Sequence, residues 1–285
     1  MTDHDHENDT FTIGGDMTVF RLGFGAMRIT GAGIWGWPGD IDGAKKLLAR
    51  VVELGINLID TADAYGPEVS EYLIAQALRP YPDNLVIATK GGLTRSGPGT
   101  WTPDGRPEHL LRAVENSLRR LERERIDLYQ LHAIDDNVPL EDSVGALKDM
   151  QDAGKIRHVG VSNFKVEDLV RARRIVNVVT VQNRYNLADR AHQAVLDYCT
   201  DNGIGFIPWF PLATGRLTED GGDIAAIAAR HGASPGQIAL AWLLATSPVT
   251  LPIPGTSSIA HLEDNTRARD IRLSEDDLAT LDALA

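Results

Sequence analysis

The stretch IDLYQLH at residues 126–132 is followed by LEDSVGALKDMQDAGK at residues 140–155 and then by IRHVGVSN at residues 156–163. The first and last pieces are almost continuously apolar, as strands buried on both faces of a parallel sheet are. The middle piece carries apolar residues at helical spacing and reaches a glycine near its end, as helices often do. Together they predict a strand, a helix and a second parallel strand with a right-handed crossover.

The same alternation extends over most of the chain. Six further apolar runs occur, at residues 21–27, 56–61, 85–90, 178–183, 204–209 and 249–254. Amphipathic stretches lie between them, for example at residues 43–55, 70–78, 109–122, 166–175 and 194–203. Eight such units predict a single (β/α)8 TIM barrel, for which about 250 residues is typical. A doubly wound sheet is the alternative. No linker divides the repeats, so residues 11–285 are expected to form one domain.

Three additions to the barrel are expected. FTI, GGD and MTV at residues 11–19 suggest an N-terminal β-hairpin that closes the N-terminal mouth of the barrel. Residues 1–10 are expected to form a disordered tail. Extra C-terminal helices are predicted because residues 221–232 and 235–245 offer two helices where one would suffice, and a capped helix begins at Ser274.

Charge and cysteine content exclude several classes of partner. The 285 residues carry 28 Lys and Arg against 40 Asp and Glu, a formal net charge of −12. This sign argues against general binding to nucleic acid or to an anionic membrane. Cys199 is the only cysteine, in a helical pattern, so no intrachain disulfide can form. With no signal peptide and no long apolar span, a cytoplasmic location is expected. No metal site is expected either, since no Cys/His cluster exists.

Polar side chains follow several of the predicted strands at the end where a barrel carries its active site. They are Asp60, Tyr65, Lys90, His132, Ser162, Asn163 and Gln182. Each alone has a structural interpretation, such as a loop cap, packing or a satisfied core histidine. Their joint placement at successive strand ends favours a catalytic set.

The chemistry of this set suits the reduction of a carbonyl group. A phenol has an ordinary pKa near 10, and a neighbouring ammonium lowers it. Tyr65 beside Lys90 is therefore expected to be a proton donor with a lowered pKa. Asp60 would hold Lys90 charged, and His132 would hydrogen-bond the substrate oxygen.

The sequence resembles the aldo-keto reductase family. The motifs that carry the resemblance span nearly the whole chain in order. They are IDTADAYG (59–66), ATKGG (88–92), LYQLH (128–132), KIRHVGVSNF (155–164), VQNRYN (181–186), PWFPL (208–212) and IPGTSSIAHLEDN (253–265). The resemblance implies a (β/α)8 barrel that binds NADP(H) without a Rossmann domain. It also implies that Asp60, Tyr65, Lys90 and His132 form the catalytic tetrad, with Tyr65 as general acid.

The resemblance further implies a set of cofactor contacts. Ser162, Asn163 and Gln182 would bind the nicotinamide carboxamide, and Trp209 stands where the family usually stacks a Tyr on the ring. The remaining expected contacts are Pro211, Leu212, Gly215, Arg216, Leu217, Ile253, Gly255, Thr256, Ser257, Ser258, His261, Asp264 and Asn265. In this last stretch the chain lacks the Lys or Arg that pairs the 2′-phosphate in many members. It offers hydroxyls, His261 and a helix N-terminus instead.

A glycine-rich motif near the N-terminus could be mistaken for a dinucleotide-binding site. GAGIWG at residues 31–36 satisfies the dinucleotide fingerprint G-x-G-x-x-G, but no helix opens at its third glycine. We interpret it as the first loop of the barrel. Trp35, Trp37 and Trp101 would then line the substrate pocket, with plain loop packing as the alternative.

The expected function is NADPH-dependent reduction of an aldehyde or ketone. The motifs PWFPL and IPGTSSIAHL are similar to a bacterial branch that includes pyridoxal reductases, which implies pyridoxal as the leading substrate. An NADP(H)-binding sensor with little turnover is the alternative. The same residues serve alcohol oxidation, so the direction stays open. The resemblance favours a monomer, without excluding an oligomer.

Overall fold

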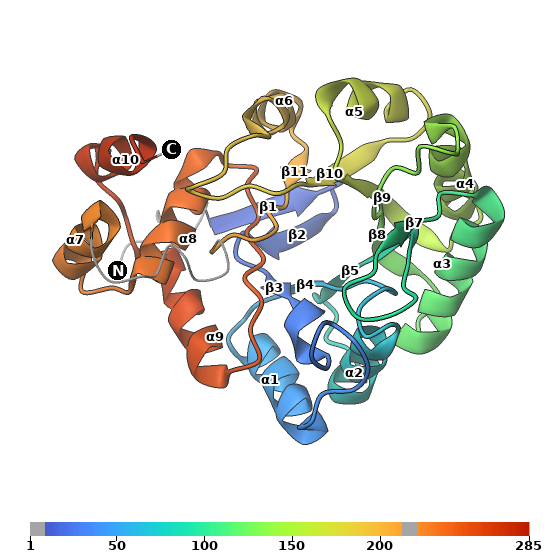
Figure 1. The fold of residues 1–285 in the computed structure, drawn as a ribbon, viewed down its shortest axis with the longest axis horizontal. Coiled ribbons are helices and arrows are strands. Elements are labelled where there is room, and N and C mark those ends of the chain that lie inside the picture. The colour runs from blue at the N-terminus through green and yellow to red at the C-terminus, as the bar shows by residue number, and fades with distance from the viewer. Residues whose placement is uncertain (1–8, 213–221, 285) are drawn as a thin grey trace.

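A curved parallel sheet forms the centre of the molecule. The computed structural model describes residues 9–212 and 222–284. Seven strands lie side by side in chain order (Figure 1). They are β3 (Phe24–Gly25), β4 (Leu58–Asp60), β5 (Val86–Gly91), β8 (Ile126–Leu131), β9 (Ile156–Ser162), β10 (Val178–Gln182) and β11 (Gly205–Phe206). All six neighbouring pairs are parallel, as the buried apolar runs predict.

The eighth predicted strand closes the ring although it is not a regular strand. Leu251 N–H donates to Phe206 of β11, and Gly23 and Gly25 donate to the carbonyls of Pro252 and Pro254. A proline has no N–H, so these two residues cannot return a hydrogen bond toward β3. The prolines thus explain why residues 249–254 pair on both sides yet lack a full ladder. The closed ring confirms the predicted barrel and excludes the doubly wound sheet.

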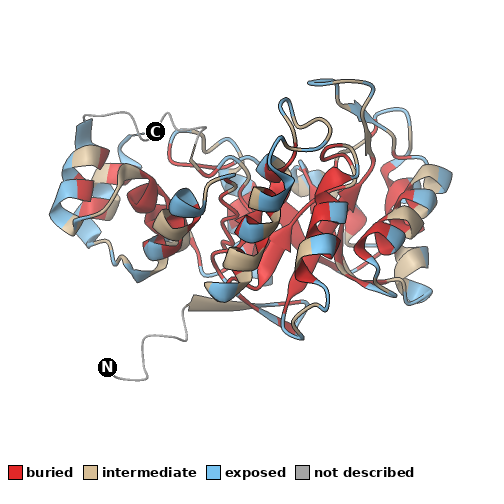
Figure 2. Ribbon diagram, turned by 90° about the horizontal axis from the view of Figure 1, so that it is seen from below, coloured by how far each residue is buried: buried red, intermediate tan, exposed pale blue. Residues whose placement is uncertain are grey.

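Helices surround the sheet (Figure 1). Those of the repeating units are α1 (Ile41–Glu53), α2 (Val69–Leu78), α3 (Pro107–Leu121), α4 (Leu140–Asp152), α5 (Val166–Ala172), α6 (Gln193–Asn202), α8 (Pro235–Thr246) and α9 (Ile259–Thr266). Their apolar faces pack on the outer side of the strands, which leaves the buried residues toward the centre and the exposed ones outside (Figure 2). This arrangement places every strand's carboxyl end at one rim of the barrel.

The predicted hairpin is confirmed. β1 (Thr10–Ile13) and β2 (Met17–Phe20) pair antiparallel around Gly14 and Gly15, both with positive φ. Ile13, Met17 and Val19 are buried in one cluster with residues of β4, β5, β8 and β10, so the hairpin fills the amino-terminal end of the barrel. It lies at the end opposite the long loops (Figure 2). β1 begins at Thr10, the last residue of the expected tail, and residues 1–8 lie outside the described part.

The predicted extra C-terminal helices are also found. α7 (Gly222–His231) packs beside α8, and α10 (Glu275–Asp282), capped by Ser274, packs on α7. The short elements that were not predicted include the helix η2 (Ala26–Ile29) and the antiparallel strands β6 (Leu93–Thr94) and β7 (Thr102–Pro103) in the third loop. A short helix, η4 (Arg267–Asp270), follows α9. Among the described helices, none is both long and apolar enough to span a membrane.

Candidate active site

Four polar side chains meet inside the rim at the carboxyl ends of the strands. Asp60 is the last residue of β4, Lys90 lies near the end of β5, and His132 follows β8 directly. Tyr65 comes from the loop between β4 and α2. All four are buried, with at most 8% of any residue exposed. The predicted set is therefore brought together.

Lys90 connects this set. Its ammonium donates to Asp60 Oδ2 at 2.6 Å, to the carbonyl of Thr61 at 2.8 Å and to the hydroxyl of Tyr65 at 3.4 Å. The three bonds satisfy the three N–H donors that a lysine has. Asp60 thus fixes the charge of Lys90, and Lys90 faces the phenol that would donate the proton.

The direction of the pKa shift of the phenol differs from the sequence-based expectation. Burial raises the pKa of Tyr65, Lys90 lowers it and Asp60 raises it again, so that the pKa lies above its ordinary value of 10.0. The sequence predicts that Lys90 lies near Tyr65. It does not show that burial and Asp60 raise the pKa of Tyr65 by more than Lys90 lowers it. For Lys90, burial lowers the pKa, but Asp60 and Tyr65 raise it more. Lys90 is charged and Tyr65 holds its proton at neutral pH.

His132 is neutral. Burial and the neighbouring Lys90 hold the pKa of its imidazole well below the ordinary 6.5. Its ring packs edge-on against Tyr65, with ring centres 5.9 Å apart. Nδ1 is buried and has no hydrogen-bond partner among the described residues. A neutral imidazole can donate one N–H to a carbonyl oxygen, which matches the expected role.

The second oxygen of Asp60 has two donors. Gln182 and Gln130 each donate a side-chain N–H to Oδ1, at 2.8 and 3.1 Å. Gln130 is fully buried and was missed from the sequence. The available signal is its position two residues before His132, because alternate residues of a strand share a face. Gln182 therefore contacts the tetrad, besides its expected role at the nicotinamide.

The residues expected around the nicotinamide form one cluster. The Asn163 amide donates to the His132 carbonyl and to Ser162 Oγ at 3.1 and 3.0 Å. Its oxygen accepts from Trp209 Nε1 at 3.1 Å. Asn163 has φ of 63°, a left-handed conformation that Asn tolerates. Amides, a hydroxyl and a half-buried indole ring are groups that suit a carboxamide and a flat ring, so the residue types fit a nicotinamide.

The expected adenosine end lies at the start of α9. Ser258 caps this helix, with its side chain accepting from His261 N–H, and Thr256 Oγ1 accepts from Ser258 N–H. Ser257 and His261 are exposed. A capped helix start whose hydroxyls accept from the backbone and can still donate suits a phosphate. Asp264 instead accepts from Ser234 and Gln237 at the start of α8, so its carboxylate is already engaged.

Other expected contacts lie deeper or outside the described part. Ile253 belongs to the interior apolar cluster, and Asn265 is also buried. Gly255 passes so close to Gly25 that a Cβ at position 255 would stand 2.7 Å from the Gly25 carbonyl oxygen. Pro211 is buried and Leu212 is half-buried beside the core. Gly215, Arg216 and Leu217 lie outside the described residues.

One of the three predicted pocket tryptophans contacts the tetrad, and a second lies in a loop that pairs with the Tyr65 loop. Trp101 packs edge-on against Tyr65 and His132, with ring centres 6.4 Å apart in both cases. Trp35 pairs its backbone with Gly66, the residue after Tyr65. Trp37 stacks on Tyr72 of α2 and is 45% exposed, and its role in the pocket stays a prediction.

Residues 31–36 form a loop, and α1 begins only at Ile41 with Asp40 as its cap, which confirms the rejection of the dinucleotide fingerprint. Cys199 is fully buried in α6, and burial raises its pKa to about 12. Within residues 9–212 and 222–284, no three His, Cys, Asp or Glu side chains gather as metal ligands.

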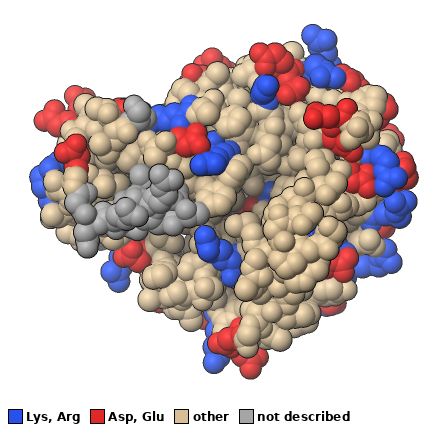
Figure 3. Space-filling model, in the orientation of Figure 1, with Lys and Arg blue, Asp and Glu red and all other residues tan. Residues whose placement is uncertain are grey.

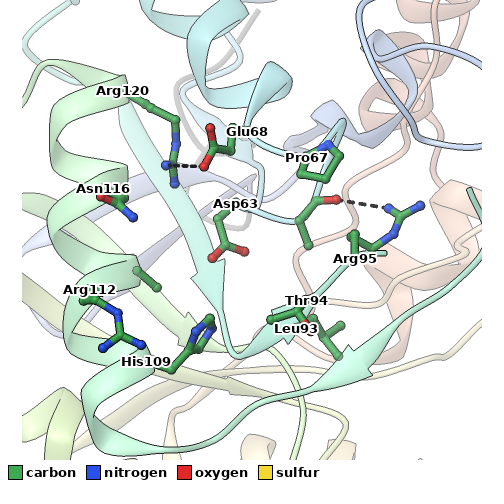
Figure 4. A pocket seen from close by; sticks show the side chains of 12 residues that line it. Asp63, Pro67, Glu68, Leu93, Thr94, Arg95, His109, Arg112, Asn116 and Arg120 are labelled. Atoms are coloured by element: carbon green, nitrogen blue, oxygen red, sulfur yellow. Dashed lines mark hydrogen bonds and ion pairs between the residues drawn. The ribbon is translucent and has the colours of Figure 1, made fainter. Parts of the chain in front are cut away.

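A cavity of about 220 Å³ lies beside the tetrad, between the Tyr65 loop, β6 and α3. Asp63 points into it opposite His109 (Figure 4). Burial and Glu71 hold the pKa of Asp63 well above its ordinary value, and burial lowers the pKa of His109. None of the four tetrad residues lines this cavity, so it is separate from the tetrad.

Known proteins are similar to this chain in sequence and in fold. The model of the aldo/keto reductase family matches residues 21–285. An uncharacterized oxidoreductase of Schizosaccharomyces pombe is 51% identical over 94% of this chain and 87% of the relative. Pyridoxine 4-dehydrogenase of Escherichia coli is 42% identical over 98% and 99% of the two chains.

A solved structure agrees with these matches. The aldo-keto reductase of Klebsiella pneumoniae, determined in complex with NADPH, is 31% identical with a TM-score of 0.83, covering 97% of this chain and 94% of that one. The chain therefore belongs to the aldo/keto reductase family.

Proposed function

We propose that this protein reduces an aldehyde or ketone to an alcohol with NADPH, and that pyridoxal is its leading substrate. The observation that carries the proposal is the contact of Lys90 with both Asp60 and Tyr65. Bound NADPH would supply hydride to the carbonyl carbon. Tyr65 would donate its proton to the carbonyl oxygen, since its raised pKa keeps the phenol protonated at neutral pH.

The other tetrad residues would support that proton transfer. Lys90 would stabilise the negative charge that develops on the phenolate oxygen, and Asp60 keeps Lys90 charged and in place. Neutral His132 would donate a hydrogen bond to the carbonyl oxygen. Burial of all four excludes water, which strengthens these electrostatic interactions.

The choice of cofactor is supported by the residues around the tetrad. Ser162, Asn163, Gln182 and Trp209 would hold the nicotinamide, and the start of α9 would hold the 2′-phosphate end. The Klebsiella pneumoniae relative was solved with NADPH, which supports the same cofactor here.

The substrate is supported by a relative and by the character of the surface. The Escherichia coli relative is named for pyridoxine, an alcohol whose oxidation at one carbon gives an aldehyde. A broad surface without Lys, Arg, Asp or Glu lies over the loops that follow β3 and β5 (Figure 3). An uncharged aromatic aldehyde suits such a surface. The cytoplasmic location and monomeric state stay predictions.

The test is the initial rate of NADPH oxidation with pyridoxal, for the wild type and Tyr65→Phe, with NADH in parallel. We expect saturable turnover in the wild type, and in Tyr65→Phe a loss of about a hundredfold or more in kcat, the usual contribution of a general acid. NADPH binding by fluorescence titration should be retained in the variant. Tyr198→Phe, on α6, is the matched control and should keep full activity.

Each other outcome has a distinct meaning. Full activity of Tyr65→Phe would remove the general-acid role. Turnover with other carbonyls but not with pyridoxal would discard the named substrate alone. Tight NADPH binding without turnover on a panel of aldehydes and ketones would support the sensor instead.

A further inference from the structure

Among the described residues, the side chain of Arg95, in the third loop of the barrel, donates hydrogen bonds only to backbone carbonyls. Its five N–H groups donate to five carbonyl oxygens at 2.9–3.5 Å, those of Gly33, Ile34, Ala64, Gly97 and Thr100. Figure 4 shows the bond to Ala64, beside Pro67. Among the described residues no carboxylate forms an ion pair with Arg95. Every donor of the guanidinium is thus used to hold loop backbone.

These five carbonyls belong to three separate loops. Residues 31–36 follow β3, residues 61–68 follow β4 and carry Tyr65, and residues 95–101 belong to the loop between β6 and β7. The first two loops are also joined directly, since Gly36 N–H donates to the Gly66 carbonyl. One side chain therefore connects all three loops at the catalytic rim.

The first of these loops holds a strained residue where Arg95 binds it. Ile34 has φ of 56°, a left-handed conformation that a β-branched residue rarely adopts. Such conformations persist where surrounding contacts enforce them, and they gather at functional sites. The hydrogen bond from Arg95 to the Ile34 carbonyl is one such contact, and it fixes the backbone next to Trp35.

The guanidinium also contacts the two tryptophans near the tetrad. It lies 3.6 Å from the ring centre of Trp101 and 5.6 Å from that of Trp35. Trp101 in turn packs against Tyr65 and His132. Arg95 therefore holds the Trp101 ring, which in turn packs against Tyr65.

We infer that Arg95 is a positioning residue that fixes Trp35 and Trp101 as the walls of the substrate pocket and so selects flat aromatic aldehydes. This inference rests on the proposed function. A lysine could not replace it, because an ammonium has three donors and no plane to stack on an indole ring. The loops would then lose several of their shared contacts while the tetrad itself stays intact.

The test compares the full-length wild type with Arg95→Lys and Arg95→Met. Arg171→Met is the control, since Arg171 lies on the exposed surface of α5 and pairs with Glu141. The first readout is amide hydrogen exchange, which needs no turnover. We expect faster exchange at residues 31–36 and 97–101 in both Arg95 variants, and unchanged exchange in the strands. Unchanged exchange in these loops would overturn the inference.

The second readout is the ratio of kcat/KM for pyridoxal to kcat/KM for propanal. Both Arg95 variants should lose about tenfold of this preference, mainly through a higher KM for pyridoxal, as misplaced positioning groups do. The Kd for NADPH should stay at the wild-type value. In a Trp101→Ala background, Arg95→Met should have little further effect, because the ring that it positions is gone.

The outcomes separate the two proposals. If the wild type turns over neither these two aldehydes nor any carbonyl of the wider panel, the proposed function fails, and hydrogen exchange still decides whether Arg95 joins the loops. If exchange rises but the preference for pyridoxal is unchanged, the selecting role of Arg95 is overturned. Equal losses for both aldehydes would likewise show that Arg95 does not select the substrate.

Discussion

The protonation state of Tyr65 gives the most direct test of the proposed site. Because burial and Asp60 raise the pKa of this phenol more than Lys90 lowers it, the group stays protonated well into the alkaline range. A general acid works only in its protonated form, so activity is lost as the pH rises through its pKa. For reduction with saturating NADPH, kcat/KM should be flat between about pH 7 and 9 and fall only above about pH 10, since the ordinary phenol pKa is near 10.

That profile is measured from initial rates across the range, with enzyme stability checked at each pH. Tyr65→Phe is the control, and its residual rate should lack the alkaline fall. A wild-type profile that falls near pH 8 would show that Lys90 outweighs burial, as the sequence alone suggests.

The sequence predicts which residues of the site come together, but it does not predict their pKa shifts or all of their hydrogen bonds. Asp60, Lys90 and His132 were predicted because the carboxyl ends of parallel strands share one rim. The direction of the pKa shift of Tyr65 depends on burial, which no motif contains. Arg95 was missed because its partners are backbone carbonyls, which have no signature in the residue types around them.

Between elements, the contact of α2 with α3 and β5 depends on a buried charge. Glu71 of α2 is fully buried. Its carboxylate accepts a hydrogen bond from Arg120 of α3 at 2.6 Å and another from Thr89 of β5 at 2.6 Å. Removing the charge of Glu71 leaves the buried Arg120 paired only with Glu68, whose side chain is half-exposed, and breaking a buried pair is costly. Glu71→Gln should therefore lower the free energy of unfolding by about 3 kcal/mol.

Glu68 provides a matched control for this prediction. It pairs with the same Arg120, but its side chain is 53% exposed, so Glu68→Gln should cost less than about 1 kcal/mol. Urea unfolding of both variants and the wild type, without cofactor, measures the difference. Equal losses would show that burial of the Glu71 carboxylate is not what matters at this contact.

Elements were predictable where their pattern is long and periodic. The hairpin and seven of the eight helices of the repeating units follow from apolar spacing and glycine positions, whereas α9 was expected only as a helix N-terminus implied by the resemblance. The strand pair β6 and β7 was missed because each strand has two residues, too few for a period. The segment 249–254 was predicted as a strand from its apolar residues, but Pro252 and Pro254 limit its hydrogen bonds to half a ladder on the side of β3.

For the whole molecule, the barrel closes between β3 and residues 249–254, where Gly23 and Gly25 donate to Pro252 and Pro254 and the prolines return no hydrogen bond. Gly25 stands at this seam, and a Cβ there would lie 2.7 Å from the carbonyl oxygen of Ile253. Its φ of −90° and ψ of 116° suit any residue, so alanine would be opposed only by that contact. Overpacking of this kind costs about 1–3 kcal/mol, and we expect Gly25→Ala to lose about 2 kcal/mol of unfolding free energy.

Gly39→Ala is the control for the seam, because a Cβ at Gly39 has nothing within 4 Å. There the alanine should be neutral or should stabilise by up to about 1 kcal/mol, through the lower entropy of the unfolded chain. Circular dichroism and tryptophan fluorescence should report the same urea transition for Gly25→Ala, because opening the seam breaks the closed sheet and the whole barrel then unfolds as one unit. The segment after Ile253 carries the expected adenosine contacts, so Gly25→Ala should also weaken NADPH binding while Gly39→Ala leaves it unchanged. A Gly25→Ala protein as stable as the wild type would show that the ring does not depend on close contact at the seam.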